Sequence, residues 1–118
     1  MKSYYSRKAG FTLVEIMIVV AIIALLAAIA IPNFVKARSL SQKSACLANL
    51  KQTEGAKSTW ALEQKKTLTD IPVDSDLFGS TLYIRQKPEC PAGGTYSLQA
   101  VDTKPTCSKG PAPDDHAI

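Results

Sequence analysis

The sequence predicts an α+β protein in which one long N-terminal helix packs on a small antiparallel β-sheet. A nearly continuous apolar run covers residues 11–31, and a stretch rich in Ala, Leu, Lys, Gln and Glu follows over 33–66. Turn residues separated by short alternating segments fill 67–110. A chain of 118 residues forms at most one small domain plus an anchor, which excludes a multidomain enzyme.

The net charge of +4 is concentrated at the N-terminus. Three of the four positive charges come from Lys2, Arg7 and Lys8, which stand in the first ten residues without an acidic neighbour. The remaining chain carries a net charge of only +1, and its adjacent pair Lys65 and Lys66 fits the C-terminal end of a helix. A nucleic-acid partner is therefore not expected, because phosphate binding needs clustered basic side chains.

The apolar run predicts a membrane-spanning helix. Its 21 residues, 11–31, include a single charged side chain, Glu15, and as a helix they span about 31 Å, enough for a bilayer core. The preceding basic residues place the N-terminal tip in the cytoplasm and the bulk of the chain outside. An ordinary secretory signal peptide is less favoured, because the run is long and continues into helix-forming sequence without a break.

The segment Lys8-Ala9-Gly10-Phe11-Thr12-Leu13-Val14-Glu15 resembles the prepilin leader of type IV pilins and type II secretion pseudopilins. The resemblance is contiguous through Pro32 and implies a pilin-like fold. It also implies that a prepilin peptidase removes a leader, 1–10, by cutting between Gly10 and Phe11, and methylates the new amino terminus of Phe11. The helix over 11–32 then serves both to span the membrane and to polymerise.

Two further residues of this segment have expected assembly roles. A carboxylate inside a bilayer costs about 2.5–3.5 kcal/mol at the centre and less toward the interface, so Glu15 needs a partner. Cutting before Phe11 creates an α-ammonium, and in a filament that of a neighbouring subunit can neutralise Glu15; the alternative is a Glu15 that reaches the lipid headgroups. Pro32 removes a backbone donor from the helix, and the resemblance implies a local bend or melting there.

The amphipathic half of the helix is predicted over 33–66. Eight residues fall within one half of its circumference at 100° per residue and should cover a sheet: Val35, Leu40, Cys46, Leu47, Leu50, Thr53, Trp60 and Ala61. Glu54 and Lys57 interrupt that half and can pair with each other. Trp60 is expected to anchor the core.

The headgroup, 67–110, is predicted to contain a short helical turn and one hairpin. The turn begins near Asp74 and ends at Gly79, and a strand over 93–98 pairs with a return strand over 106–108. The resemblance extends to 46–63, 90–96 and 105–107, which are similar to small-headgroup pilin-like proteins, although the calcium loop of major pseudopilins has no counterpart, so no calcium site is carried over. The Pro-rich end, 111–118, is expected to be a loose tail.

Three cysteines are candidates for one disulfide, because export places them in an oxidising compartment. Cys90 and Cys107 flank the predicted hairpin, and a bridge between them is favoured because it would contribute about 3 kcal/mol in the chain-entropy model. Cys46 lies on the apolar helix face and is either a buried thiol or the partner of one of the other two. No metal site is expected, because the spacing of the cysteines and of His116, the single histidine, matches no zinc motif.

No catalytic residues and no cofactor are expected, because the sequence contains no nucleophile elbow, phosphate-binding loop or zinc motif. The expected function is that of a structural subunit. It waits in the inner membrane as a single-pass protein with its headgroup in the periplasm and then polymerises with copies of itself. Its expected partners are prepilin peptidase, an assembly ATPase and an inner-membrane platform protein.

The filament is either a cell-surface type IV pilus or a periplasmic type II secretion pseudopilus, with a slight preference for the second. Two alternatives stay open at this point. One is a minor pilin that binds DNA or a surface ligand, which the mature net charge of +1 disfavours. The other is a membrane-anchored periplasmic protein that never polymerises.

Overall fold

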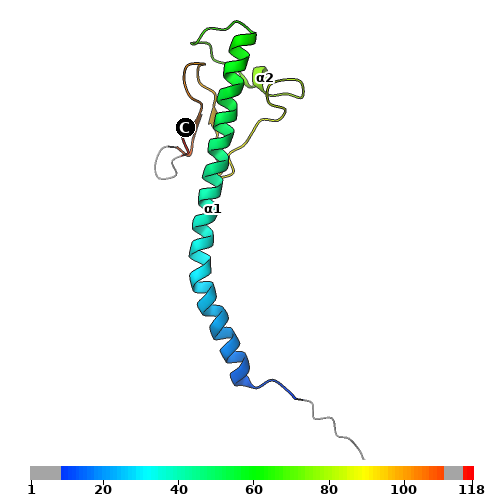
Figure 1. Cartoon of the computed structure of the whole chain (residues 1–118), viewed down its shortest axis with the longest axis vertical. Coiled ribbons are helices and arrows are strands. Elements are labelled where there is room, and N and C mark those ends of the chain that lie inside the picture. Colours follow the sequence, from blue (N-terminus) through cyan, green and yellow to red (C-terminus); the bar gives the residue numbers. More distant parts are fainter. Residues whose placement is uncertain (1–8, 111–115) are drawn as a thin grey trace, which may run out of the picture. The chain divides into compact units, whose positions relative to one another are not determined.

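The computed structural model describes residues 9–110 and 116–118, and the basic side chains Lys2, Arg7 and Lys8 lie outside this part. The chain divides into two compact units, Met1–Lys36 and Ala37–Ile118. One helix, α1 (Leu13–Glu63), passes through both, so its two parts are described separately (Figure 1). The remaining elements are α2 (Asp74–Leu77), β1 (Tyr96–Ser97) and β2 (Thr106–Cys107).

The first unit is the apolar start of α1. An 18-residue window of this helix has a mean hydropathy of 3.0, and none of it is buried inside the chain. It is therefore long and apolar enough to cross a membrane. The helix continues through Pro32, where the side-chain amide of Asn33 donates a 3.2 Å hydrogen bond to the carbonyl of Ile29. Pro32 has no backbone N–H to donate, and this bond is made by the residue that follows it.

The second unit is built around the remainder of α1, and its loops and short strands flank the helix in Figure 1. Strands β1 and β2 form the predicted antiparallel hairpin, with Tyr96 opposite Cys107 and Ser97 opposite Thr106. The predicted helical turn is α2, and the backbone amide of Val73 before it donates a 3.0 Å hydrogen bond to the carboxylate of Asp76. The α+β class with a small antiparallel sheet is thus confirmed.

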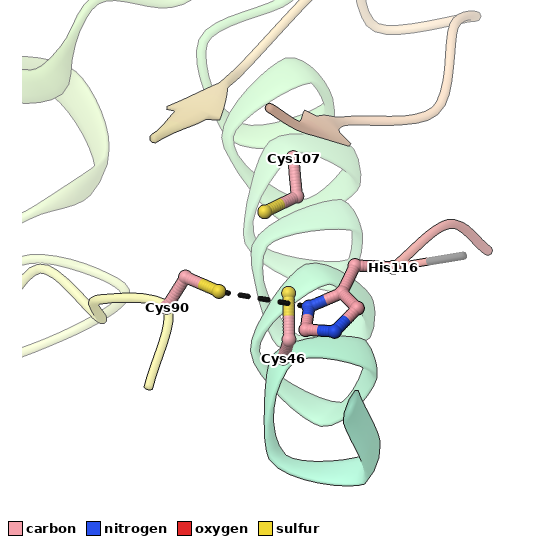
Figure 2. Close-up of side chains that lie close together, drawn as sticks. All are labelled: Cys46, Cys90, Cys107 and His116. Carbon is pink, nitrogen blue, oxygen red and sulfur yellow. Dashed lines mark hydrogen bonds between the residues drawn. The ribbon is translucent and has the colours of Figure 1, made fainter. Parts of the chain in front are cut away.

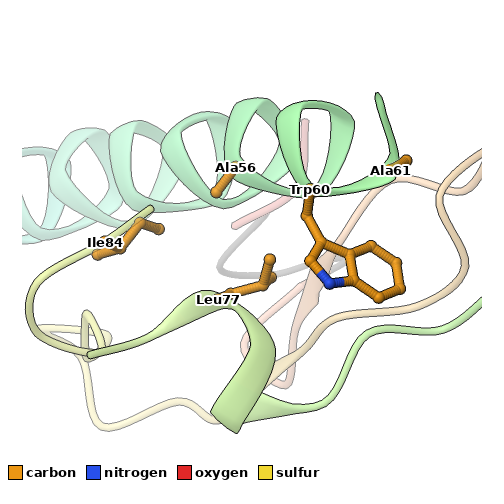
Figure 3. Close-up of a cluster of buried hydrophobic side chains, with 5 residues drawn as sticks. All are labelled: Ala56, Trp60, Ala61, Leu77 and Ile84. Carbon is orange, nitrogen blue, oxygen red and sulfur yellow. The ribbon is translucent and has the colours of Figure 1, made fainter. Parts of the chain in front are cut away.

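A buried apolar cluster joins α1 to α2 and the following loop (Figure 3). It consists of Ala56, Trp60, Ala61, Leu77 and Ile84. Trp60 is buried there, as predicted. A second cluster combines Leu50 with three cysteines, Cys46, Cys90 and Cys107.

Side chains of α1 hold the loops through their backbone carbonyls. Gln42 donates to Pro91 (3.2 Å), and Asn49 donates to Glu89 (3.1 Å). Lys57 donates to Leu98 (2.6 Å) and to the carbonyl of Thr103. These side-chain bonds attach the loops to α1, where the two-residue strands offer few backbone partners.

The structure corrects three details of the predicted helix. It begins at Leu13 and ends at Glu63, where the amide of Lys66 donates back to the carbonyl of Ala61 (2.9 Å). Val35 and Leu40, expected on the face that covers the sheet, are exposed, and the buried residues of the helix begin at Cys46. Lys57, expected to interrupt the apolar face and pair with Glu54, is fully buried and donates to carbonyls instead.

Candidate functional site

The first candidate site is the start of α1, where the expected cleavage position lies. Gly10 and Phe11 precede the helix, and the Phe11 side chain is 86% exposed. A Cβ atom added at Gly10 would meet nothing within 4 Å. Nothing in the described chain therefore requires a glycine at this position.

Glu15 and Thr12 form a reciprocal cap at the first turn. The backbone amide of Thr12 donates to Oε2 of Glu15 (3.2 Å), and the amide of Glu15 donates to Oγ1 of Thr12 (3.3 Å). This is a capping box, which satisfies two backbone donors that a helix N-terminus otherwise leaves without partners. This cap was not among the features predicted from the sequence, although the Thr-x-x-Glu spacing is the usual sequence signal of a capping box.

The second candidate site is a cluster of sulfur and nitrogen atoms against α1 in the second unit (Figure 2). Cys46 lies on α1, Cys90 in the loop before β1, Cys107 on β2, and His116 near the C-terminus; all four are buried. One ligand atom from each lies within 4.8 Å of all the others. The Sγ of Cys90 and the Nδ1 of His116 are 3.6 Å apart.

The three cysteines are free thiols in this structure, so the expected bridge between Cys90 and Cys107 is not confirmed. The surroundings of the thiols differ. Burial raises the pKa of Cys46 to about 12, although the hydroxyl of Tyr96 acts in the opposite direction. Burial would also raise the pKa of Cys90, but hydrogen bonds from the backbone amides of Gly94 and Ala92, and the contacts with His116 and Cys46, lower it to about 7.

His116 lies where a loose tail was expected, and it is only 3% exposed. Residues 111–115 of that tail lie outside the described part of the chain. The expectation of no metal site rested on the spacing along the sequence, and the fold brings together four residues that this spacing separates. A local signal for a cysteine with donors around its sulfur was present in Cys90-Pro91-Ala92-Gly93-Gly94, where the amides of Ala92 and Gly94 follow Cys90 closely.

Comparison with known proteins adds independent evidence about the N-terminal part. Residues 5–31 match the family model described as the prokaryotic N-terminal methylation motif. The chain is 50% identical over 60 residues to the type IV major pilin protein PilA of Myxococcus xanthus. That match covers 51% of this chain and 27% of PilA, so the chain spans about a quarter of that relative's length.

Two other relatives match over more of their length. The type II secretion system core protein G of Klebsiella michiganensis is 27% identical over 101 residues, covering 75% of this chain and 71% of that protein. The competence protein ComGC of Halalkalibacterium halodurans is 29% identical over 99 residues, covering 84% and 92%. No solved structure matches the chain significantly.

An apolar first helix with a carboxylate in its first turn, followed by a small α+β headgroup, is the architecture of the pilin-like α+β fold. The methylation motif and these relatives support the type IV pilin and pseudopilin family for this chain, most strongly for its N-terminal part.

Proposed function

We propose that this chain is a structural subunit of a helical filament, either a type IV pilus or a type II secretion pseudopilus. The observation that carries the proposal is the capped carboxylate of Glu15 at the head of an apolar helix whose side chains are not buried by the chain itself. Such a surface needs lipid or other helices to cover it. In the filament, copies of the same helix cover it.

Processing converts the membrane-anchored form into the polymerising form. Prepilin peptidase hydrolyses the peptide bond between Gly10 and Phe11, which releases residues 1–10 and leaves an amine on Phe11 that is then methylated. Exposure of Phe11 fits a bond that an enzyme must reach. The open space around Gly10 fits a glycine selected by the peptidase rather than by the fold.

Neutralisation of Glu15 drives registration between subunits. In the uncut chain, its carboxylate accepts a hydrogen bond from the amide of Thr12, which leaves the negative charge in place. After cleavage, the ammonium of Phe11 of the partner subunit supplies the opposite charge. Because an unpaired charge is costly in an apolar surrounding, a subunit packs where that contact forms.

The headgroup lies in the periplasm before assembly, because the basic residues at the N-terminus favour the cytoplasmic side. Extraction from the inner membrane is driven by an assembly ATPase acting through a platform protein. Pro32 weakens the helix locally, which lets the helix bend when it packs against the helices of neighbouring subunits. The subunit itself is proposed to have no enzymatic activity; the relatives named above include a type IV major pilin and a type II secretion core protein.

Intact-protein mass spectrometry tests the processing step. Membranes and material sheared from cells should both contain Phe11–Ile118 carrying one methyl group. Retention of residues 1–10 in cells with an active prepilin peptidase would contradict the proposal. Recovery of the processed chain in the sheared fraction identifies a surface pilus, and its confinement to the cell envelope identifies a pseudopilus.

A matched pair of substitutions tests the role of Glu15. Glu15→Gln removes the charge and nearly preserves size, and it should abolish or strongly reduce filaments while the processed subunit accumulates in the membrane. Glu89→Gln makes the same change at an exposed headgroup position and should leave filaments intact. Normal assembly of the Glu15→Gln subunit would show that charge neutralisation does not drive registration.

A further inference from the structure

The cluster of Cys46, Cys90, Cys107 and His116 has the composition of a metal site. It offers three sulfur atoms and one imidazole nitrogen, and these come from four separate segments of the second unit. Soft thiolates with imidazole select zinc among the common divalent ions. All four side chains are buried, which is typical of a closed structural site rather than a catalytic site with an open position.

The distances are close to those of a tetrahedral zinc centre. Zn–S bonds of about 2.3 Å and Zn–N bonds of about 2.0–2.1 Å place the ligand atoms of a tetrahedron about 3.5–3.8 Å apart. The Sγ of Cys90 and the Nδ1 of His116 are already 3.6 Å apart, and no pair among the four ligand atoms exceeds 4.8 Å. Closing the cluster therefore requires movements of about 1 Å or less.

The surroundings of Cys90 are suited to negatively charged sulfur. Backbone amides of Ala92 and Gly94 donate to the sulfur of Cys90. The hydroxyl of Tyr96 bonds to Cys46 and is itself held by the side-chain amide of Asn49 at 3.1 Å. Hydrogen bonds of this kind orient metal ligands and stabilise their charge.

Gly94 gives the cluster the room that it needs. A Cβ atom at this position would stand 2.6 Å from the Sγ of Cys107 and 3.3 Å from the Sγ of Cys90. Only glycine allows the loop to pass this close to two sulfur atoms. The loop thus packs directly against the sulfur cluster.

We propose that Cys46, Cys90, Cys107 and His116 bind one structural Zn²⁺ ion that fastens the headgroup loops and the C-terminus to α1. Binding replaces the three thiol protons by the metal and involves no change of oxidation state. The inference goes beyond the filament function and does not depend on it.

The proposed role follows from the small size of the headgroup. Its sheet has two residues in each strand, and its buried apolar clusters contain few side chains. Small domains with limited cores are commonly stabilised by disulfides or metal ions. A zinc ion at this position ties together Cys46 on α1, Cys90 before β1 and Cys107 on β2, and it also holds His116 beyond the segment 111–115.

A disulfide is the competing use of the same sulfur atoms. Joining Cys90 to Cys107 would remove two electrons and two protons to an external oxidant and would leave Cys46 and His116 without a role. Zinc instead uses all four residues. A zinc site therefore requires His116 and Cys46, whereas a disulfide between Cys90 and Cys107 requires neither.

The first experiment measures zinc bound to the full-length chain in detergent. Reduced, metal-free protein is titrated with Zn²⁺ against a chromophoric chelator, and the expected result is one tightly bound zinc per chain. Replacement by Co²⁺ should give thiolate-to-cobalt charge-transfer absorption of a tetrahedral site. Failure of the reduced chain to bind zinc at micromolar concentration would overturn the proposal.

Variants of His116 and Cys46 show whether these residues bind the zinc ion or only pack beside the other side chains. His116→Ala and Cys46→Ser should each weaken zinc binding by more than about 100-fold. Loss of a residue that only hydrogen-bonds to a metal ligand already lowers metal affinity about 10–100-fold, and loss of the ligand itself should cost more. His116→Cys should restore tight binding with a cobalt spectrum of four thiolates, which a merely packed side chain would not do. Glu89→Gln, a change beside Cys90 in an exposed side chain, should bind zinc as the wild type does. Wild-type affinity in His116→Ala would overturn the proposal.

The state in cells distinguishes zinc from a disulfide. Chain extracted from membranes is unfolded with chelator and alkylated before any reductant is added. Modification of all three cysteines is expected if zinc holds them as thiolates. Modification of one cysteine, with two released only by reduction, would show a disulfide and overturn the proposal.

Discussion

The ammonium of Lys57 is fully buried and donates a 2.6 Å hydrogen bond to the carbonyl of Leu98, 41 residues further along the chain. It also donates to the carbonyl of Thr103. Leu98 and Thr103 lie between β1 and β2, so this side chain of α1 bonds the connection of the hairpin at two points, in addition to the backbone bonds of Val101 and Asp102 to the 68–70 loop. The buried lysine therefore acts as a structural hydrogen-bond donor to loop carbonyls in a headgroup whose strands are only two residues long.

Replacing Lys57 should destabilise the headgroup. Lys57→Met keeps most of the aliphatic packing but removes the donor for two carbonyls, and an unsatisfied buried acceptor costs about 1–3 kcal/mol. We expect the free energy of unfolding of the detergent-solubilised chain to fall by about this amount in urea titrations. Lys51→Met, at an exposed position of the same helix, should change it little. Equal stability of the two variants would show that the carbonyls find other donors.

The same lysine makes stability depend on pH. Burial lowers the pKa of Lys57 below its ordinary value of 10.5, although Glu54 and Asp102 act in the opposite direction. Between the folded and unfolded pKa values, the unfolded chain holds the proton more often, so the free energy of unfolding rises with pH in that window. The wild type should therefore gain stability relative to Lys57→Met as the pH rises toward 10.5. A difference that shrinks with rising pH would contradict the assigned direction.

Features set by neighbouring residues could be predicted from the sequence. The helix follows from composition and apolar spacing, the hairpin from turn glycines and alternation, and the burial of Trp60 from its place on the apolar face. Glu15 stands out because one carboxylate interrupts an apolar run.

Features set by long-range contacts could not be predicted in this way. A lysine on a helix is normally solvated, and nothing near Lys57 in the sequence indicates that two carbonyls more than 40 residues away will surround it. His116 sits in a Pro-rich polar end, which suggests a loose tail, yet it packs beside Cys90. Ligand spacing along the chain identifies only those metal sites whose ligands lie in local turns.

The cap at the start of α1 should stabilise the first helical turn independently of filament assembly. Thr12→Ala removes the side-chain acceptor for the amide of Glu15, and loss of such a cap costs about 1 kcal/mol. Hydrogen–deuterium exchange in detergent should show faster exchange of that amide, with Thr12→Ser close to the wild type. Thr59→Ala, at an exposed position near the C-terminal end of the same helix, should not affect the first turn. Unchanged exchange in Thr12→Ala would show that the cap contributes nothing measurable.

Two glycine substitutions should have opposite effects on stability. Gly94→Ala places a Cβ atom 2.6 Å from the Sγ of Cys107 and 2.9 Å from the Cγ of Lys109, so the loop must shift; overpacking of this kind costs about 1–3 kcal/mol. Gly55 lies inside α1, where an added Cβ meets nothing within 4 Å. Alanine there should stabilise the helix by about 0.8–1 kcal/mol because it lowers the entropy lost on folding.

Thermal unfolding of the two variants, followed by circular dichroism in the same detergent, measures this contrast. The melting temperature should fall for Gly94→Ala and rise for Gly55→Ala relative to the wild type. Because both changes add one methyl group, a general effect of side-chain size cannot produce opposite signs. A Gly94→Ala chain as stable as the wild type would mean that the loop does not pass as close to Cys107 as the 2.6 Å contact requires.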